Sequence, residues 1–454
     1  MDSRFLPHNT HVKGLEHYWQ VDPQLSQLAN QPYRYDFPMV HALPVGQPGI
    51  YTVGGGRQIG KTTLLKQWVA HLIAHHGLSA RQIVFVTGEI IDDHHHLISL
   101  LTDVLQGMDP STTSYVIVDE VTYIRDWDKA VKFLADSGQL RSTVLVLTGS
   151  ELTMIREARM RFPGRRGAQA QTDFHLYPLS FRAYLSLVEL LPELNDGLIE
   201  PEQCTEVFWQ KLYQAFDQYL LHGGYLTAIN DVAKHKLIMS NTLQTYSDWI
   251  RGDVLKRNKQ ETYLKEILMA IIKHYGSQIS WNVLAQSLSV DHHKTVSDYI
   301  ALLADMDATF IQYALLEDKL VAAPKKARKV WFCDPFIYHA THHWLCPGQA
   351  DMTTILQDTQ CVSGLVETAV ISHFRRQYDT YYIKAAGEVD VAFIKDQTFW
   401  PIEIKWTNQL QPKELKQIQK YKNGEVWCKQ PHFSHIQHLP LKPLPWVLAN
   451  MEID

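Results

Sequence analysis

The chain has 454 residues, of which 45% are hydrophobic and 20% charged, a length and composition expected of a protein with two or three globular domains. It contains no apolar run of 18 residues, so the sequence predicts no membrane-spanning helix, and the first residues lack the apolar core of a signal peptide. The net charge of −5 means that any nucleic-acid binding would need a local basic face. Five scattered cysteines without a C-x-x-C pattern argue against disulfides or a zinc finger and favour the cytoplasm.

Residues 1–48 are polar and proline-rich, so we expect an N-terminal lead-in that packs on the first domain. From 49 to 177, short apolar runs alternate with helical patterns. Continuous apolar strands that alternate with helices are typical of a parallel sheet covered on both faces, which predicts an α/β fold for this part of the chain.

An apolar strand, a glycine-rich turn and an apolar-periodic helix succeed one another between Ile50 and Ile73. The turn matches G-x-x-x-x-G-K-[ST], in which glycines let backbone N–H groups wrap phosphates at a helix N-terminus. The lysine can reach the β- and γ-phosphates, and the hydroxyl after it can ligate Mg²⁺. We therefore expect this turn to bind ATP or GTP, with Lys61 also acting in catalysis and Thr62 also binding the metal. The residues expected to contact the nucleotide are Gly55, Gly56, Arg57, Gln58, Ile59, Gly60, Lys61, Thr62 and Thr63.

A second nucleotide motif is the apolar strand that begins at Ser114 and ends in Asp119-Glu120. Asp119 is expected to hold the Mg²⁺ shell through water, and Glu120 to orient and polarise the attacking water. A glutamate at this place is typical of P-loop ATPases with an inserted strand rather than of GTPases, so ATP is the expected nucleotide.

The next strand, 143–147, should lie between the two motif strands and ends in Thr148-Gly149-Ser150. Ser150 is expected to touch the γ-phosphate or the attacking water; the alternative is that it caps a helix over 151–159. Arg165 and Arg166 come next in the chain. An arginine that contacts the phosphates in the transition state raises the rate of phosphoryl transfer by roughly 10³–10⁵-fold. Arg165 could act in its own chain or from a neighbouring subunit of a homo-oligomer, and the alternative is a solvated basic turn.

Residues 178–260 read as helical and are expected to form a lid over the nucleotide. Residues 261–335 carry three helical patterns and two short strands, the order of a winged helix-turn-helix. If this module binds DNA, its third helix would enter the major groove and its wing would contact phosphates. The alternative is that the module serves in packing or dimer formation. The expected contacts are His292, His293, Lys294 and Ser297 on the helix, and Lys325, Lys326, Arg328 and Lys329 on the wing.

Residues 336–362 are expected to be a linker with helical pieces. Residues 363–454 then show the pattern of a helix, three strands, a helix over 413–422 and a final strand. Asp390 and Glu403 lie on neighbouring strands and could hold Mg²⁺, completed by Glu367 from the helix. Lys405 lies on the same strand face as Glu403, because side chains alternate along a strand, and could orient a water molecule or stabilise charge. This D…E-x-K arrangement predicts a metal-dependent nuclease centre; the alternatives are an exposed charged hairpin, or a nuclease-like fold that binds without cutting.

The order of these motifs resembles the prokaryotic AAA+-type ATPases that carry a winged helix and a C-terminal restriction-endonuclease-like region. Further matched stretches are Gly164-Arg165, residues 177–181, Gly223-Gly224-Tyr225 and residues 364–367, whereas Leu226 and Thr368 depart from the family pattern. The resemblance implies a P-loop NTPase parallel sheet, a helical lid, a winged helix-turn-helix and a restriction-endonuclease-like α/β domain.

Two functional hypotheses fit these features. The first is an ATP-hydrolysing, Mg²⁺-dependent protein coupled to a nuclease-like domain that acts on DNA. The second is a nucleotide-switched interaction protein whose C-terminal domain binds nucleic acid or protein without cleavage. The intact set of Asp390, Glu403 and Lys405 favours the first, and the acidic net charge favours the second.

Overall fold

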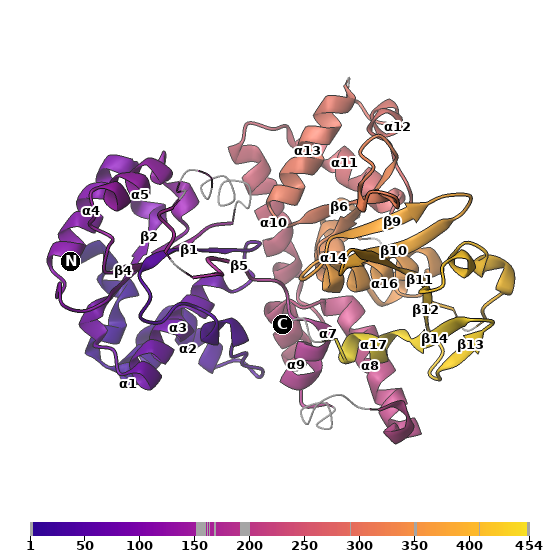
Figure 1. Ribbon diagram of the computed structural model, residues 1–454, viewed down its shortest axis with the longest axis horizontal. Helices are drawn as coiled ribbons and strands as arrows, with labels where there is room; N and C mark the ends of the chain where they lie inside the picture. The colour runs from indigo at the N-terminus through magenta and orange to yellow at the C-terminus, as the bar shows by residue number, and fades with distance from the viewer. Residues whose placement is uncertain are drawn as a thin grey trace. The chain divides into compact units, whose positions relative to one another are not determined.

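The computed structural model describes residues 3–150, 160, 162, 164–167, 169–190, 200–290, 292–348, 352–407 and 409–451. The helix expected at 151–159 lies outside these residues. Two compact units result: the first runs to Tyr177 and includes Asp305–Asp307, and the second holds the rest (Figure 1). No helix within the described ranges has both the length and the apolar character needed to cross a membrane.

The first unit is built on a five-stranded parallel sheet. Its strands are β1 (Gly49–Gly54), β2 (Ile83–Thr87), β3 (Ser114–Asp119), β4 (Thr143–Thr148) and β5 (Asp173–His175). Their order is β2-β3-β4-β1-β5, so β4 lies between the two motif strands, and the predicted strand order is confirmed. In a parallel sheet all strands end at one edge, so β1, β3 and β4 deliver their motif residues to the same place.

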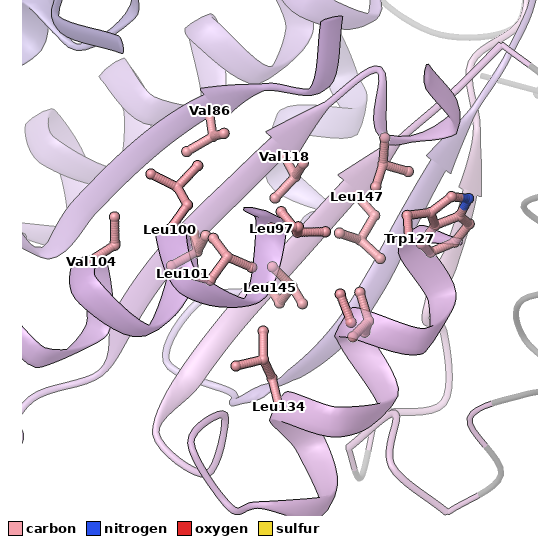
Figure 2. Packing of buried hydrophobic residues seen from close by; sticks show 14 of the residues in the cluster. Val86, Leu97, Leu100, Leu101, Val104, Val118, Trp127, Leu134, Leu145 and Leu147 are labelled. Carbon is pink, nitrogen blue, oxygen red and sulfur yellow. The ribbon is translucent and has the colours of Figure 1, made fainter. Parts of the chain in front are cut away.

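Helices cover both faces of this sheet. On one face, α4 (His94–Gln106) and α5 (Trp127–Asp136) turn Leu97, Leu101 and Leu134 toward the strands, as Figure 2 shows. The other face is covered by α3 (Lys61–His76) and the N-terminal helices α1 (Leu15–Val21) and α2 (Pro23–Ala29). The N-terminal residues therefore belong to the same compact unit as the sheet.

A buried ion pair fastens the N-terminal residues to α3. Asp22 caps α2 by accepting hydrogen bonds from the backbone N–H groups of Gln24 and Leu25. Its second carboxylate oxygen lies 2.6 Å from the Lys66 ammonium, and neither side chain is exposed. Lys66 also donates to the His8 carbonyl at 3.0 Å. Its buried ammonium therefore joins α3, shortly after the glycine loop, to the start of α2 and to the segment around His8.

Replacing Asp22 with alanine is expected to lower the free energy of unfolding of the first unit by about 3–5 kcal/mol, because the buried Lys66 ammonium loses its counter-charge. Urea unfolding followed by tryptophan fluorescence measures the loss. The double variant Asp22→Ala/Lys66→Met, which removes both charges, should recover most of it. A single variant within about 1 kcal/mol of wild type would contradict the role given to this pair.

The second unit contains the predicted helical region and the remainder of the chain. Its helices are α7 (Phe181–Leu187), α8 (Glu206–His222), α9 (Leu226–His235), α10 (Ser240–Lys256), α11 (Glu261–Lys273), α12 (Trp281–Gln286), α13 (His293–Asp305), α14 (Pro335–Leu345), α15 (Met352–Ile355), α16 (Thr359–Phe374) and α17 (Leu444–Ala449). The prediction of helices over 178–260 and of three helices before a hairpin is confirmed for the described residues.

One mixed sheet runs through the second unit. Its strands are β6 (Thr309–Leu316), β7 (Val321–Ala322), β8 (Arg328–Phe332), β9 (Thr380–Lys384), β10 (Glu388–Lys395), β11 (Thr398–Lys405), β12 (Glu425–Cys428), β13 (Ser434–Ile436) and β14 (Leu439–Pro443). Their order is β13-β14-β12-β11-β10-β9-β6-β7, and β8 pairs with β6. The hairpin expected to be a free wing is therefore continuous with the C-terminal sheet, because β6 pairs in parallel with β9.

The region over 336–362, expected to be a linker with helical pieces, contains α14, in which residues 336–341 are all buried, and the start of α16. One sequence prediction in this unit was wrong. The helix expected over 413–422 is instead two short 3₁₀ turns, Pro412–Leu415 and Ile418–Lys420. The buried Leu415 and Ile418 are three residues apart, a spacing that suits a 3₁₀ turn as well as an α-helix.

The Gly223-Gly224 pair has a packing role. Gly223 has a φ of 54°, and a Cβ there would overlap the Asp334 carboxylate. The Gly224 N–H donates to the same carboxylate at 2.9 Å, and Asp334 also caps α14. Burial raises the pKa of Asp334 to about 7. The chain can pass this close to Asp334 because Gly223 lacks a side chain, whereas a Cβ on Gly224 would overlap the backbone of Leu179.

Candidate functional site

The glycine loop joins β1 to α3 at the edge where the strands end. Gly55 and Gly60 have φ values of 143° and 105°, which glycine adopts readily. A Cβ on Gly55 would lie 2.6 Å from the Leu176 carbonyl oxygen, and one on Gly60 would lie 2.9 Å from the Phe37 ring. The loop conformation therefore depends on these glycines, and the 16-residue helix α3 begins directly after them, which suits anion binding.

Lys61 lies at the centre of the loop and is 5% exposed. Its ammonium donates to the carbonyl oxygens of Gly55 and Gly56, each at 2.9 Å, and to the Ser150 hydroxyl at 3.0 Å. Burial lowers the pKa of Lys61, and the Glu120 carboxylate opposes that shift. This is a cation inside the loop, held where phosphate oxygens would need it.

The other predicted loop residues lie around this centre. The Arg57 guanidinium donates to the Tyr123 hydroxyl at 2.7 Å, Gln58 has a left-handed φ of 58°, and Ile59 packs on the apolar cluster under the loop. Thr63 is half-buried in the first turn of α3.

Thr62 and Asp119 form the candidate metal position. The Thr62 hydroxyl donates to one Asp119 carboxylate oxygen at 2.7 Å, and the Thr148 hydroxyl donates to the other at 2.5 Å. Burial raises the pKa of Asp119, while the two hydroxyl hydrogen bonds lower it. A hydroxyl and a carboxylate are hard oxygen ligands of the kind that Mg²⁺ takes together with phosphate oxygens and water, so these residues fit the ion.

Thr148 is a site residue that sequence reasoning missed. Besides holding Asp119, its hydroxyl accepts the backbone N–H of Glu120 at 2.9 Å. A signal was present, because Thr148 ends the strand predicted to lie between the motif strands, next to Asp119 and Glu120.

Glu120 and Ser150, both expected near the attacking water, lie in contact with each other. The Ser150 hydroxyl lies 3.0 and 3.2 Å from the two carboxylate oxygens of Glu120, and the Lys61 ammonium lies 3.8 Å from one of them. Glu120 has a left-handed φ of 51°, and a Cβ on Gly88 would lie 2.5 Å from its carbonyl. Such backbone conformations cost of order 1–3 kcal/mol and cluster at functional sites.

Arg165 is not brought to this centre. It pairs with Asp136, the last residue of α5. The carbonyl of the next residue, Arg166, packs on Gly49, where β1 begins, and a strand of six residues separates Gly49 from the loop by about 17 Å. Arg166 binds Asp173 through two guanidinium nitrogens. Action of Arg165 on the nucleotide of its own chain does not fit this position.

The second unit brings together the other predicted site residues. The Lys405 ammonium lies 2.5 Å from Glu403 and 3.9 Å from Asp390, whose strands are adjacent in the sheet. Asp390 also accepts the backbone N–H of Ile404 at 2.9 Å. One carboxylate oxygen of Glu403 is buried without a hydrogen-bond partner among the described residues.

Lys329 joins this cluster, contrary to its expected place on an exposed wing. It is 1% exposed, and its ammonium lies 2.5 Å from Glu388, 3.4 Å from Glu367 and 3.9 Å from Asp390. We call the four carboxylates and two ammonium groups the carboxylate–lysine cluster: Glu367, Glu388, Asp390, Glu403, Lys329 and Lys405.

The charges in this cluster respond to burial and to one another. Burial raises the pKa of Glu367 and of Glu403 to about 8 in each case. Burial alone would lower the pKa of Lys329 and Lys405, but the surrounding carboxylates raise both above their ordinary value. Among the described residues, no three His, Cys, Asp or Glu side chains are grouped as a metal site would require. The predicted metal ligands Glu367, Asp390 and Glu403 share their space with lysines instead.

The remaining predicted contacts are on the surface. His292, His293 and Lys294 at the start of α13 are exposed, as are Lys325 and Lys326 before β8, while Ser297 is half-buried. Arg328 lies with its guanidinium 4.5 Å from the centre of the Trp281 ring, a contact within the second unit.

Comparison with known proteins bears on the first unit. Residues 47–185 match the model of a family described as an AAA domain, and residues 213–345 match that of a domain of unknown function. No curated protein matches the chain.

Three solved structures are among those to which the chain is similar. The Walker-type ATPase PABY2304 of Pyrococcus abyssi is 15% identical, with a TM-score of 0.40 over 64% of this chain and 91% of that one. The ORC1 protein of Aeropyrum pernix in complex with DNA is 13% identical, with a TM-score of 0.31 over 74% and 96%. RuvB of Thermotoga maritima is 16% identical, with a TM-score of 0.29 over 58% and 81%. TM-scores this low decide nothing about function, whereas the family match coincides with the strand, glycine loop and helix described above. Residues 47–185 thus match an AAA domain and have the glycine loop and parallel sheet of a P-loop ATPase fold.

Proposed function

We propose that the protein binds ATP with Mg²⁺ at the glycine loop and hydrolyses it. The observation that carries the proposal is the continuous set of contacts from Thr62 through Asp119 and Thr148 to Glu120, Ser150 and Lys61. A phosphate ligand, a metal ligand and a water-polarising carboxylate thus meet at one sheet edge.

Each side chain has a role in this proposal. Loop N–H groups and Lys61 bind phosphate oxygens, and Thr62 and Asp119 hold the metal shell. Mg²⁺, when bound, neutralises charge that develops on the phosphates. Glu120 takes a proton from water, and Ser150 keeps the Glu120 carboxylate oriented. Lys61 exchanges its loop carbonyl partners for phosphate oxygens on binding.

In this proposal Arg165 acts only on the nucleotide that is bound by a neighbouring subunit. It lies at the edge of the sheet opposite to its own loop, and half of a homo-oligomeric interface could use that edge. Its ion pair with Asp136 would have to open for the guanidinium to reach a neighbour's phosphate.

For the C-terminal half we propose binding of nucleic acid without cleavage. The carboxylate–lysine cluster favours the non-cutting hypothesis over the cutting one, because two ammonium charges already lie among the carboxylates, Lys329 at 2.5 Å from Glu388 and Lys405 at 2.5 Å from one oxygen of Glu403. Exposed Lys294, Lys325 and Lys326 are suited to phosphate contacts.

One experiment tests both parts. Wild-type protein is incubated with ATP, Mg²⁺ and linear DNA, and phosphate release, DNA binding and DNA length are measured together. We expect Mg²⁺-dependent turnover that DNA raises, DNA binding that weakens with salt, and DNA that stays intact. The triple variant Lys294→Glu/Lys325→Glu/Lys326→Glu should bind DNA more weakly.

The outcomes separate the proposals. ATP binding without turnover would replace the hydrolysis proposal with a nucleotide switch. Metal-dependent shortening of the DNA that is lost in Asp390→Ala would overturn the non-cutting proposal and restore a nuclease centre.

A further inference from the structure

We infer that Lys329 takes the place of a metal ion in the carboxylate–lysine cluster, so that the C-terminal sheet holds its acidic residues with a resident side-chain cation. The inference rests on the proposed non-cutting role of this half and names the feature that would enforce it. It assigns a positioning role to a residue outside the D…E-x-K segment.

The position of Lys329 is that of a shared counter-ion. Its ammonium lies within 4 Å of carboxylates from α16 and from two positions on β10: Glu367 at 3.4 Å, Glu388 at 2.5 Å and Asp390 at 3.9 Å. The ammonium also lies over the rings of Trp331 and Tyr382, 5.5 and 5.7 Å from their centres. A buried ammonium is costly unless paired, and here three carboxylates pair with it.

The hairpin that carries Lys329 is fixed to the strand that carries Asp390. The Gln312 amide on β6 donates to the backbone carbonyls of Asp390 and Tyr381 at 2.9 and 3.0 Å. The Trp331 indole on β8 donates to the same Gln312 side chain at 2.9 Å. Together with the β6–β9 pairing, these hydrogen bonds fix the hairpin against β9 and β10, and so hold Lys329 beside the carboxylates of the cluster.

A divalent cation cannot share this place. Mg²⁺ and Mn²⁺ need about six oxygen ligands at about 2.0–2.2 Å in near-octahedral geometry. Carboxylates drawn onto an ammonium do not provide that arrangement, and a metal ion would first have to displace a lysine that the hairpin holds in position. Removing the Lys329 charge should therefore create metal affinity where the wild type has none.

The test is Mn²⁺ binding to the full chain without nucleotide, followed by the electron paramagnetic resonance signal of free Mn²⁺. We expect Lys329→Met to bind one more Mn²⁺ than wild type, and Lys329→Met/Asp390→Asn to lose that ion. Lys319→Met removes an exposed lysine from the turn between β6 and β7 and should bind like wild type.

Several results would overturn the inference. One is wild-type Mn²⁺ binding that Asp390→Asn abolishes; another is a folded Lys329→Met that gains no ion. If Lys329→Met is unfolded alone, millimolar Mn²⁺ should restore its circular dichroism, and failure to do so counts against the inference. DNA cleavage by wild type is a separate result, which would refute the proposed function whatever the Mn²⁺ count shows.

Discussion

The Glu120→Gln variant is expected to bind ATP as tightly as wild type and to hydrolyse it about 10²–10⁴-fold more slowly, the usual contribution of a positioned general base. Glutamine keeps the size of the side chain and an oxygen that can accept the Ser150 hydroxyl, which lies 3.0 Å from Glu120. It cannot take a proton from water. Phosphate release under saturating ATP gives the rate, and filter binding of radiolabelled ATP gives the affinity.

Two further variants make this result specific. Asp103→Asn removes the same charge from α4, on the surface of the first unit, and should leave turnover unchanged. Ser150→Ala leaves the carboxylate in place without its hydroxyl partner and should slow turnover by roughly 10-fold, less than loss of the base. Wild-type turnover in Glu120→Gln would mean that another group activates the water.

The sequence could predict the first site because its information is local. The glycine loop, Asp119-Glu120 and Ser150 each come after an apolar strand, and a parallel sheet collects strand ends at one edge. The predicted strand end included Thr148, but no role was assigned to this residue. A threonine at the end of a strand is common and does not by itself indicate a functional site. The sequence left open whether Arg165 acts in its own chain or on a neighbour, because nothing local indicates to which edge of the sheet a loop returns.

The C-terminal site was harder to predict for a different reason. Asp390, Glu403 and Lys405 lie on strands adjacent in sequence, so their proximity results from one hairpin. Lys329 reaches them only because β6 pairs with β9, strands that lie far apart in the chain with helices α14 and α16 between them. Pairing between strands so far apart has no sequence signal in a single chain, and Lys329 therefore read as part of an exposed basic wing.

His373 gives the second large prediction, which concerns acid. Its Nε2 accepts the backbone N–H of Phe181 at 2.8 Å, so Nδ1 carries the proton and donates to the Ala369 carbonyl at 2.6 Å. A second proton would place an N–H against an N–H. Burial, aided by the Arg376 guanidinium, lowers the pKa of His373 to about 3.

The direction of the pH effect is set by that shift. A histidine with a lowered folded pKa contributes stability that is complete above about pH 6.5 and is lost as the pH falls toward about 3. Burial lowers the pKa of His222 and of His339 to about 4, which acts in the same direction. The raised pKa values of Asp334, Glu367 and Glu403 act in the opposite direction, so the pH profile of the whole protein does not isolate His373.

The difference between wild type and His373→Gln does isolate it, because the carboxyl groups are common to both proteins. Glutamine can accept a hydrogen bond from the Phe181 N–H and donate one to the Ala369 carbonyl, but it cannot become charged.

At about pH 7 the variant should be less stable than wild type by about 1–2 kcal/mol through altered packing. At about pH 4.5 the wild type has lost about 2–3 kcal/mol of the His373 contribution, at about 1.36 kcal/mol per pH unit, so the variant should become the more stable protein. Urea unfolding at both pH values measures this difference. A pH-independent difference for His373→Gln would mean that the imidazole is not held neutral by the two backbone groups, and the contact between α16 and the start of α7 would then need another explanation.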